Sequence, residues 1–471
     1  MLASMLGAAL LAVAPAAVQA QTPAAQTAQD GAVYFAGEPE GIGDPNPYYE
    51  NGVYSIFYLK NEGRHPWWMS QTSDLSTWSK PIEAVKVGEQ GSPDVWTGSG
   101  SVIADPAGGY RLFYTGHDPN GAPMEVTMVA RAASLAGPWV KDPKATFAGK
   151  PTYDQRDFRD PFVFWNPQAK AYWMVLASRQ KFDAVIALYT SPDLVKWTAA
   201  APLYSERSPL NLEVPDLFSE GDDWFIVFSD QREEYRLVRY LTAPKSDGKY
   251  EYGRFNGLDG RAFYAGRTAG SGRERLLFGW VAHKELHKDS RDLVWGGDLV
   301  AHAIRRAGPG VLAVSLPDAV AGQFSTERAK ISLTQTLIGP ADQALLAKAD
   351  ITVKPGDRFG VSFDAGKGGK SVLELDTAKG EAAFLYRGQG ANAPRVAFPR
   401  TADGRYVVDL VIDPKRGLGV LYINRFRALS FRYYGVDKSD LALFADGGFS
   451  QLAGSVMVRA ARKQGSGGSP P

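Results

Sequence analysis

Three acidic residues in similar local sequences are the candidates for chemistry in this chain. Asp44 stands in Gly-Asp-Pro-Asn-Pro, Asp160 in Arg-Asp-Pro and Glu213 in Glu-Val-Pro-Asp. The neighbours of Glu213 are mostly apolar, and an ionised carboxylate is costly there, so we expect its pKa to be raised. A carboxyl group that stays protonated near neutral pH can act as a general acid.

Asp-Pro pairs also initiate turns, so the pair alone does not identify a functional aspartate. The chain has six Asp-Pro pairs, at Asp44, Asp105, Asp118, Asp142, Asp160 and Asp413. Of these, Asp44 and Asp160 share a position upstream of a recurring strand, described next. We therefore assign function to these two, with a purely structural turn as the alternative for each.

The strands that must position these residues recur along the first two thirds of the chain. Aromatic-rich segments begin at Tyr54, Tyr110, Tyr172, Trp224 and Leu276, which are 56, 62, 52 and 52 residues apart. Turn signals precede them, so each is predicted as the second strand of a hairpin. Repeats of this length are typical of propeller blades, which bury their faces by stacking on their neighbours. The sequence predicts a five-bladed β-propeller, with an irregular β-sandwich as the alternative.

The innermost strand of each blade lines the central channel of a propeller. Residues about ten positions before each aromatic segment should lie on these strands and face the channel. The residues at these positions are Asp44, Ser99, Asp160, Glu213 and Tyr264. Three of the five blades therefore direct a carboxylate into one channel, and we expect the three carboxylates to converge in one pocket.

The sequence pattern changes after Arg306, where a Gly/Pro-rich connector begins and the aromatic motif stops. Alternating apolar and polar residues continue, which predicts a second β-domain, most simply a sandwich. The fold class is thus all-β, a five-bladed propeller followed by a C-terminal β-sandwich. The predicted segments are a signal peptide (1–20), a flexible lead-in (21–31), the propeller as catalytic domain (32–322), the sandwich (323–462) and a disordered tail (463–471).

Composition excludes several classes of protein. The 52 basic and 51 acidic residues nearly cancel, so the charge expected of a nucleic-acid-binding protein is missing. The chain has no cysteine, which excludes disulfides, thiol nucleophiles and cysteine-ligated metals. Its five histidines lack the HExxH arrangement, so we predict neither a metal site nor a cofactor.

Residues 1–20 are an apolar segment that ends in Val-Gln-Ala and is too short to span a bilayer. This pattern predicts a signal peptide that is cleaved after Ala20. No other apolar run is long enough for a membrane span, so the mature chain is predicted to be periplasmic or secreted. The sequence does not indicate an oligomeric state.

The three acidic motifs, in this order and followed by a predicted sandwich, resemble glycoside hydrolase family 32, the invertase, levanase and inulinase group. Trp96-Thr-Gly-Ser stands where the family has Phe-Ser-Gly-Ser, and Phe263-Tyr-Ala and Gly279-Trp resemble further family motifs. The resemblance covers nearly the whole mature chain. It implies a retaining hydrolase without a cofactor that acts on an oligo- or polysaccharide, most simply a β-fructofuranoside.

The resemblance also implies roles for individual residues. Asp44 would be the nucleophile and Glu213 the acid/base, while Asp160 would bind vicinal hydroxyls of the furanosyl ring together with Arg159. Aromatic residues would stack on sugar faces. The predicted substrate-binding residues are Asn46, Trp68, Trp96, Ser99, Arg159, Tyr264 and Trp280.

Several positions depart from the family pattern. Pro47 replaces the glycine of Asn-Asp-Pro-Asn-Gly, Leu59 replaces the glutamine of Phe-Tyr-Gln, and Trp67-Trp68-Met69 stands near the place of Trp-Gly-His. These changes spare the three acids but affect the sugar pocket, so another furanoside stays open. Three alternatives are an inverting arabinanase-like hydrolase, a fructosyltransferase and a non-catalytic glycan-binding propeller.

Overall fold

The computed structural model describes residues 26–28, 31–37, 41–232, 236–363, 371–387, 392–434 and 440–460. The predicted signal peptide and the predicted C-terminal tail lie outside the described residues. Among the described residues, no helix has both the length and the apolar character that a membrane span requires.

Part of the predicted lead-in is a strand. β1 (Gln26–Ala28) pairs antiparallel with β5 (Thr77–Ser79). An edge strand such as β5 presents unpaired backbone groups, and a further strand satisfies them. These three residues of the predicted lead-in (21–31) are thus paired with the first blade.

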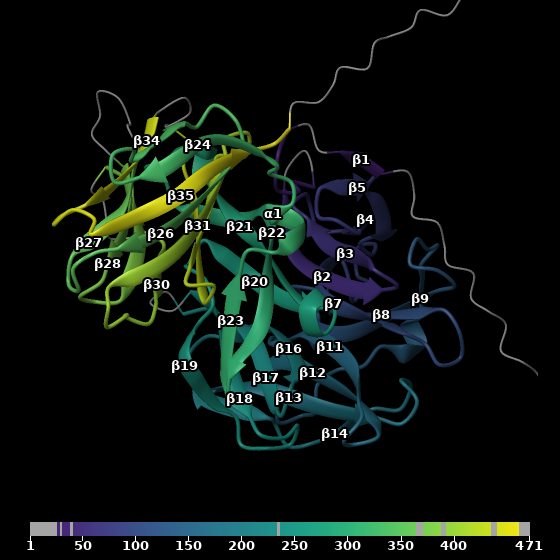
Figure 1. The fold of residues 1–471 in the computed structure, drawn as a ribbon. Helices are drawn as coiled ribbons and strands as arrows, with labels where there is room; N and C mark the ends of the chain where they lie inside the picture. The colour runs from purple at the N-terminus through teal and green to yellow at the C-terminus, as the bar shows by residue number, and fades with distance from the viewer. Residues whose placement is uncertain are drawn as a thin grey trace, which may run out of the picture.

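The first domain consists of five successive groups of antiparallel strands (Figure 1), and the pairing of Ile42 with Gly297 joins the first and the fifth group in one sheet. The first two groups are β2 (Ile42–Glu50), β3 (Val53–Lys60), β4 (Trp67–Thr72) and β6 (Ile82–Val85), then β7 (Trp96–Ala104), β8 (Tyr110–His117), β9 (Glu125–Ala132) and β10 (Val140–Lys141). The third group is β11 (Phe158–Asn166), β12 (Ala171–Gln180), β13 (Asp183–Ser191), β14 (Thr198–Ala199) and β15 (Tyr204–Arg207). The last two groups are β16 (Leu212–Glu220), β17 (Asp223–Asp230), β18 (Leu237–Ala243) and β19 (Glu251–Gly257), then β20 (Phe263–Ala269), β21 (Leu276–Lys284), β22 (Leu293–Gly308) and β23 (Val311–Ser315).

The first strands of the five groups form a closed ring. β2 contacts β7, β7 contacts β11, β11 contacts β16, β16 contacts β20, and β20 contacts β2. Each predicted aromatic segment lies in the second strand of its group, paired antiparallel with the first. The predicted all-β fold with a propeller is confirmed, and the contacts between the five inner strands place them around one channel.

Every inner strand is interrupted at the same place by a β-bulge, in which two of its residues oppose one residue of the second strand. The bulge residues are Asp44-Pro45, Gly98-Ser99, Asp160-Pro161, Val214-Pro215 and Ala265-Gly266. Proline fits there because the hydrogen-bond ladder is already broken. Asp44 and Asp160 have φ angles of 30° and 63°, values that are uncommon outside glycine and that bend the strand locally.

These bulges correct the predicted alignment of the inner strands. Asp44 and Asp160 occupy the first bulge position and Ser99 the second, whereas Glu213 and Tyr264 precede the bulge. The five side chains therefore come from three successive backbone positions instead of one. A single strand does not reveal this difference, because the pairing register with the second strand defines the bulge.

The second domain is the predicted sandwich, which follows the short helix α1 (Asp318–Ala321). One sheet has the order β24 (Thr326–Ser332), β35 (Gln451–Val458), β26 (Leu345–Thr352), β31 (Arg405–Asp413), β32 (Leu418–Ile423) and β33 (Arg427–Arg432). The other has the order β25 (Leu337–Pro340), β34 (Asp440–Ala445), β27 (Arg358–Phe363), β28 (Ser371–Asp376), β29 (Glu381–Leu385) and β30 (Arg395–Ala397). Phe384 and Phe431 stack between the two sheets with ring centroids 4.3 Å apart, so the apolar faces form one core.

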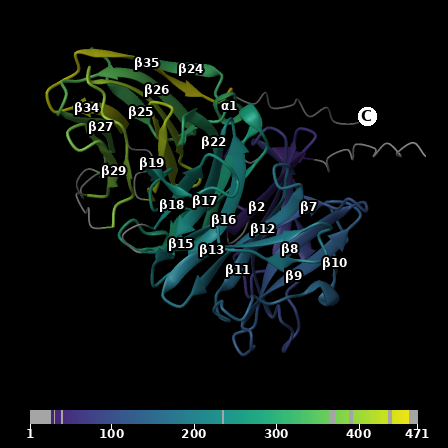
Figure 2. The same ribbon diagram turned by 90° about the horizontal axis from the view of Figure 1, so that it is seen from below.

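The two domains pack side by side through buried polar contacts (Figure 2). Asp259 of the propeller accepts hydrogen bonds from the backbone nitrogen and the Oγ of Ser430, both at 2.6 Å. His302 lies between Asp259 and Tyr422, with each ring nitrogen 3.0 Å from its partner oxygen. Because buried polar groups are costly without partners, these contacts hold the sandwich in one position on the propeller.

Candidate active site

A pocket of about 430 Å³ lies where the five inner strands meet. All five inner strands contribute residues to it. Of the residues predicted from sequence, it is lined by Asp44, Trp96, Ser99, Arg159, Asp160, Glu213, Tyr264 and Trp280. The three acidic residues thus share one pocket, as the channel argument predicts.

Asp44 is held by a tryptophan from the fifth blade. Trp280 Nε1 donates a hydrogen bond to Asp44 Oδ1 at 3.1 Å. Burial raises the pKa of the Asp44 carboxyl to about 6, and the negative charge of Asp160 adds to this increase. The Trp280 hydrogen bond and the charge of Arg267 oppose it. Asp44 is therefore ionised above about pH 6 and can act as a nucleophile.

Glu213 lies between an arginine and a tyrosine. Arg159 Nη1 donates to its Oε1 at 3.4 Å, and Tyr264 OH donates to its Oε2 at 3.1 Å. The pKa of Glu213 is raised to about 7, mainly by burial and also by the charges of Asp160 and Asp44, while Arg159 and the Tyr264 hydrogen bond oppose the increase. The sequence-based expectation of a raised pKa is confirmed, and this carboxyl group is partly protonated at neutral pH, as a general acid requires.

Asp160 is buried and anchored on both sides of its bulge. Its Oδ2 accepts a hydrogen bond from Val214 N at 2.9 Å, and its own backbone nitrogen donates to Thr115 Oγ1 at 2.8 Å. Burial raises the pKa of Asp160, while Arg159 and Arg267 oppose the increase. The Val214 backbone nitrogen thus fixes the carboxylate in the pocket. Among the described residues, no side chain is hydrogen-bonded to this carboxylate, so substrate hydroxyls can approach it without displacing one.

Arg159 is positioned by a residue that sequence reasoning missed. Its Nε donates to Glu125 Oε2 at 2.9 Å, and its Nη2 donates to Asp157 Oδ1 at 2.6 Å. Glu125 is itself buried and lies 3.1 Å from His117 Nδ1. Glu125 opens the third strand of its blade, outside the inner-strand positions, so the repeat gave no signal for it.

Two predicted substrate-binding residues are not among the described residues that line the pocket. Asn46 follows its bulge and turns toward the second blade, where its Oδ1 accepts hydrogen bonds from Ser99 Oγ at 2.9 Å and Gly100 N at 3.1 Å. Trp68 lies on β4, the third strand of its blade, with Lys60 Nζ 4.4 Å from its ring centroid. Asn46 thus joins two inner strands, and the position of Trp68 on an outer strand explains its distance from the channel.

Aromatic rings form one wall of the pocket. The His65 ring lies 5.6 Å from Trp96 and 4.3 Å from Trp295, and Trp295 lies 6.1 Å from Trp280 between centroids. Trp96 is 36% exposed, so its ring is accessible to a ligand. His65 and Trp295 were not predicted, since neither belongs to a recurring strand position. Such a wall suits the apolar face of a sugar ring.

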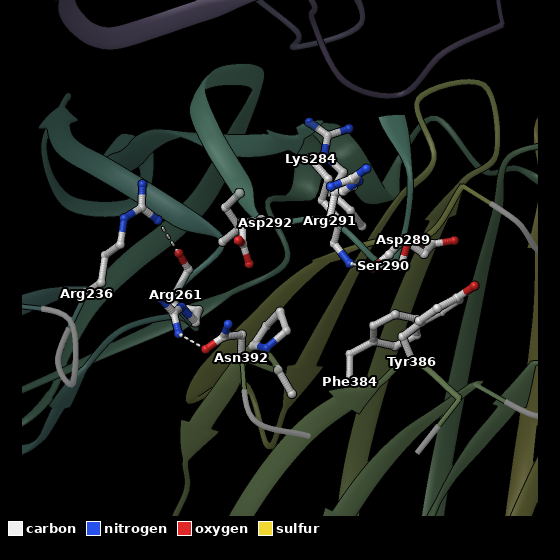
Figure 3. A pocket seen from close by; sticks show the side chains of 14 residues that line it. Arg236, Arg261, Lys284, Asp289, Ser290, Arg291, Asp292, Phe384, Tyr386 and Asn392 are labelled. Atoms are coloured by element: carbon white, nitrogen blue, oxygen red, sulfur yellow. Dashed lines mark hydrogen bonds between the residues drawn. The ribbon is translucent and has the colours of Figure 1, made fainter. Parts of the chain in front are cut away.

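A second pocket, of about 620 Å³, opens between the two domains (Figure 3). Arg236 lines both this interdomain pocket and the acidic pocket. Its Nη1 donates to the carbonyl oxygen of Arg261 at 2.6 Å, and its guanidinium lies 4.5 Å from the Tyr264 ring. Tyr386 and Asn392 contribute from the sandwich. Arg236 therefore lies between the acidic pocket and the interdomain pocket.

The part of the chain that the structure describes contains no group of three or more His, Asp or Glu side chains arranged to hold a metal ion. In the acidic pocket, Asp44 is paired with Trp280, and Glu213 is paired with Arg159 and Tyr264. What the arrangement offers chemically is one carboxylate, one partly protonated carboxyl group and a third anchored acid in a shared pocket.

The chain thus combines a propeller that carries three acids at its channel with a sandwich packed against it. Residues 35–301 match the family model of the glycosyl hydrolases family 32 N-terminal domain. The match covers more than half of the chain, and the chain belongs to this family. The resemblance stated from the sequence motifs is thereby confirmed.

Two curated relatives show the extent of the sequence similarity. The chain is 26% identical over 314 residues to a fructan 6-exohydrolase of Beta vulgaris, covering 56% of this chain and 50% of that protein. It is 26% identical over 303 residues to a levanase of Bacillus subtilis (strain 168), covering 56% of this chain and 42% of that protein. The chain thus spans about half the length of these relatives.

Solved structures share the fold over nearly the whole chain. A sucrose-6-phosphate hydrolase from Lactobacillus gasseri aligns with a TM-score of 0.75 at 17% identity, covering 91% of this chain and 93% of that chain. A fructan 1-exohydrolase IIa from Cichorium intybus aligns with a TM-score of 0.71 at 17% identity, covering 92% and 99%. At these identities the likeness establishes the arrangement of propeller and sandwich.

Proposed function

We propose that the protein is a retaining glycoside hydrolase that cleaves β-fructofuranosides by double displacement. The observation that carries this proposal is the meeting of Asp44, Asp160 and Glu213 in one pocket, with Glu213 partly protonated at neutral pH. Family membership and the relatives named above support a fructoside as the substrate.

In the first step, the Asp44 carboxylate attacks the anomeric carbon while Glu213 gives its proton to the departing glycosidic oxygen. The carbon–oxygen bond breaks, and a glycosyl ester forms on Asp44. In the second step, Glu213, now ionised, removes a proton from water, and the water oxygen attacks the same carbon. Asp44 is released as a carboxylate, Glu213 is protonated again, and the sugar leaves with its original configuration.

The remaining residues of the pocket would bind the sugar. Asp160 and Arg159 would hold vicinal hydroxyls and stabilise the positively charged transition state. Trp96, Tyr264 and Trp280 would contact the ring, since they line the same pocket. The interdomain pocket, which shares Arg236, would accommodate the leaving side of an oligosaccharide.

The decisive experiment is incubation with sucrose, inulin, levan and an aryl β-fructofuranoside, followed by identification of the released sugar and its first-formed anomer. Release of β-fructose from any of them supports the proposal. Release of the opposite anomer favours the inverting arabinanase-like alternative, transfer to another sugar favours a transferase, and binding without cleavage favours a glycan-binding propeller.

We further propose that the protein is exported to the periplasm or the medium. The proposal rests on residues 1–20, whose apolar run and Val-Gln-Ala end suit cleavage after Ala20. N-terminal sequencing of the mature protein tests it, and a mature chain that begins at Gln21 is the expected result. A retained Met1 in cytoplasmic protein would contradict it.

A further inference from the structure

A layer of residues lies directly after the five bulges, beneath the acids. In blade order these residues are Asn46, Gly100, Phe162, Asp216 and Arg267. Arg267 is the one basic residue of the five, and it is 1% exposed. A buried arginine is costly unless hydrogen bonds and negative charges compensate it, so Arg267 requires such partners.

Arg267 joins three inner strands. From β20 its Nη2 donates to the carbonyl oxygen of Asp160 on β11 at 2.8 Å, and its Nη1 donates to the carbonyl oxygen of Gly100 on β7. The side chain therefore reaches from the fifth blade to the third and the second. Both acceptors adjoin or belong to bulges, so the guanidinium holds two of the strand segments that shape the pocket.

Arg267 also supplies positive charge beneath the acids. The charged and titratable groups around Asp44 and Asp160 include Glu213 and Asp216 on β16, Tyr264 and Arg267 on β20, Arg159 on β11, and Glu125 on β9. His65, His117 and Arg236 line the same pocket. Arg159 is shared among Glu125, Asp157 and Glu213. Arg267 lowers the pKa values of both Asp44 and Asp160. Burial lowers its own pKa to about 10, so it stays protonated at neutral pH.

We propose that Arg267 is a positioning residue of the catalytic centre, which holds the Asp160 bulge through its backbone and places a buried positive charge at the base of the acidic pocket. This inference rests on the proposed function, because it takes Asp44 as the nucleophile. The two contributions are separable by substitution. Lysine retains the charge but lacks the planar, forked donor set that reaches two carbonyl oxygens, whereas methionine retains bulk and removes both.

The test compares Arg267→Lys and Arg267→Met with the wild type in the pH dependence of kcat/KM on an aryl fructofuranoside. We expect the acidic limb of Arg267→Met to move to higher pH by about one unit or more, because an opposite charge next to a carboxylate is removed. The acidic limb of Arg267→Lys should stay near that of the wild type, with a lower kcat from the lost bridge.

Arg275→Met is the matched control. Arg275 is also a largely buried arginine of the fifth blade, with its guanidinium 4.3 Å from the Phe218 ring and its Nη1 donating to Thr268 Oγ1 at 3.0 Å. Its loss should lower thermal stability without moving the acidic limb. An equal shift in Arg275→Met and Arg267→Met would show that general loosening of the blade, and not the charge of Arg267, is responsible.

A second measurement does not depend on turnover. In protein labelled at the aspartate side-chain carboxyl carbon, the signal lost in Asp44→Asn identifies Asp44, and its titration midpoint is read by NMR. We expect the midpoint to be higher in Arg267→Met than in the wild type and restored in Arg267→Lys. An unchanged midpoint overturns the inference about Arg267, whether or not the protein cleaves fructosides. A shifted midpoint in a protein that cleaves no fructoside overturns the proposed function and leaves the inference about Arg267 standing. If Arg267→Met does not fold, the lysine variant decides the question. An acidic limb or an Asp44 midpoint that lies about one unit or more above the wild type in Arg267→Lys, which retains the charge, contradicts the charge role.

Discussion

Trp280 and Asp44 are joined by a hydrogen bond of 3.1 Å between the indole nitrogen and Oδ1. Trp280 belongs to the second strand of the fifth blade and Asp44 to the first strand of the first blade. The bond therefore crosses the place where the ring of blades closes. The position of the proposed nucleophile depends on a contact between the two sequence ends of the propeller.

Replacement of Trp280 by phenylalanine should reduce kcat/KM by about 10- to 100-fold, because a hydrogen bond to a charged group contributes about 1.5–3 kcal/mol. The acidic limb of the pH profile should also move above about pH 6, since this bond lowers the pKa of Asp44. Steady-state kinetics across pH measure both effects. Trp165→Phe is the control, because Trp165 is 47% exposed on an inner strand away from the pocket. A Trp280→Phe enzyme with an unchanged pH profile would contradict the role of this bond.

The two catalytic acids should respond differently to removal. Asp44→Ala should abolish turnover of every substrate, since no covalent intermediate can form. Glu213→Ala should lose about 100- to 10,000-fold on sucrose but form the intermediate rapidly from an aryl fructofuranoside with an acidic phenol, which needs no protonation.

Added azide should then restore turnover of the Glu213→Ala enzyme and yield a fructosyl azide of retained configuration, because azide needs no general base. Product analysis by NMR gives the configuration. Equal losses on good and poor leaving groups in a well-folded variant, or an inverted azide product, would exclude Glu213 from the acid/base role.

Glu213→Gln should be more stable than the wild type at pH 8, by an amount on the order of 2 kcal/mol. The folded-state pKa of Glu213 is raised from 4.5 to about 7, so its stability contribution is complete below about pH 4.5 and is lost as pH rises through 7. Glutamine avoids the cost of the buried charge, and Arg159 retains Glu125 and Asp157 as partners. Urea unfolding at pH 5 and pH 8 tests this. A stability difference that is the same at both pH values would contradict the raised pKa.

Tyr386→Ala should lower kcat/KM for a long fructan by about 2- to 10-fold and leave sucrose hydrolysis unchanged, since aromatic contacts contribute about 0.5–1.5 kcal/mol. Tyr386 lines the interdomain pocket and not the acidic pocket. Kinetics on fructans of increasing length measure the effect. Phe182→Ala, which removes a 68% exposed ring on a distant turn, is the control. A loss that is equal on sucrose and on long fructans would contradict a leaving-side role for the interdomain pocket.

Much of the fold was predictable because one physical pattern is repeated. The aromatic second strands recur at a nearly constant spacing, so the blades and the shared pocket of Asp44, Asp160 and Glu213 could be inferred without knowing any contact. The repeat also separated the two aspartates that line the pocket, Asp44 and Asp160, from Asp105, which lies in a turn and pairs with Arg111.

Other features depend on pairing between strands, which a single sequence does not display. The one-residue offset between Glu213 and Asp160 follows from the bulges. Asn46 is part of a family-like motif, yet its side chain faces the neighbouring strand and not the pocket. Glu125, His65 and Arg236 reach the pocket from positions that are not repeated between blades, so no periodic signal marks them.

The five bulges have the same pairing pattern, and four of them place their first residue at a positive φ angle, but their side chains differ. Gly98 and Ala265 occupy the same position as Asp44 and Asp160 and carry no functional group. The backbone bend at a bulge thus occurs whether or not the residue there carries a reactive group. A change of chemistry in this architecture requires the exchange of one side chain at or directly before an existing bulge, while the strands, the turns and the ring of blades stay as they are.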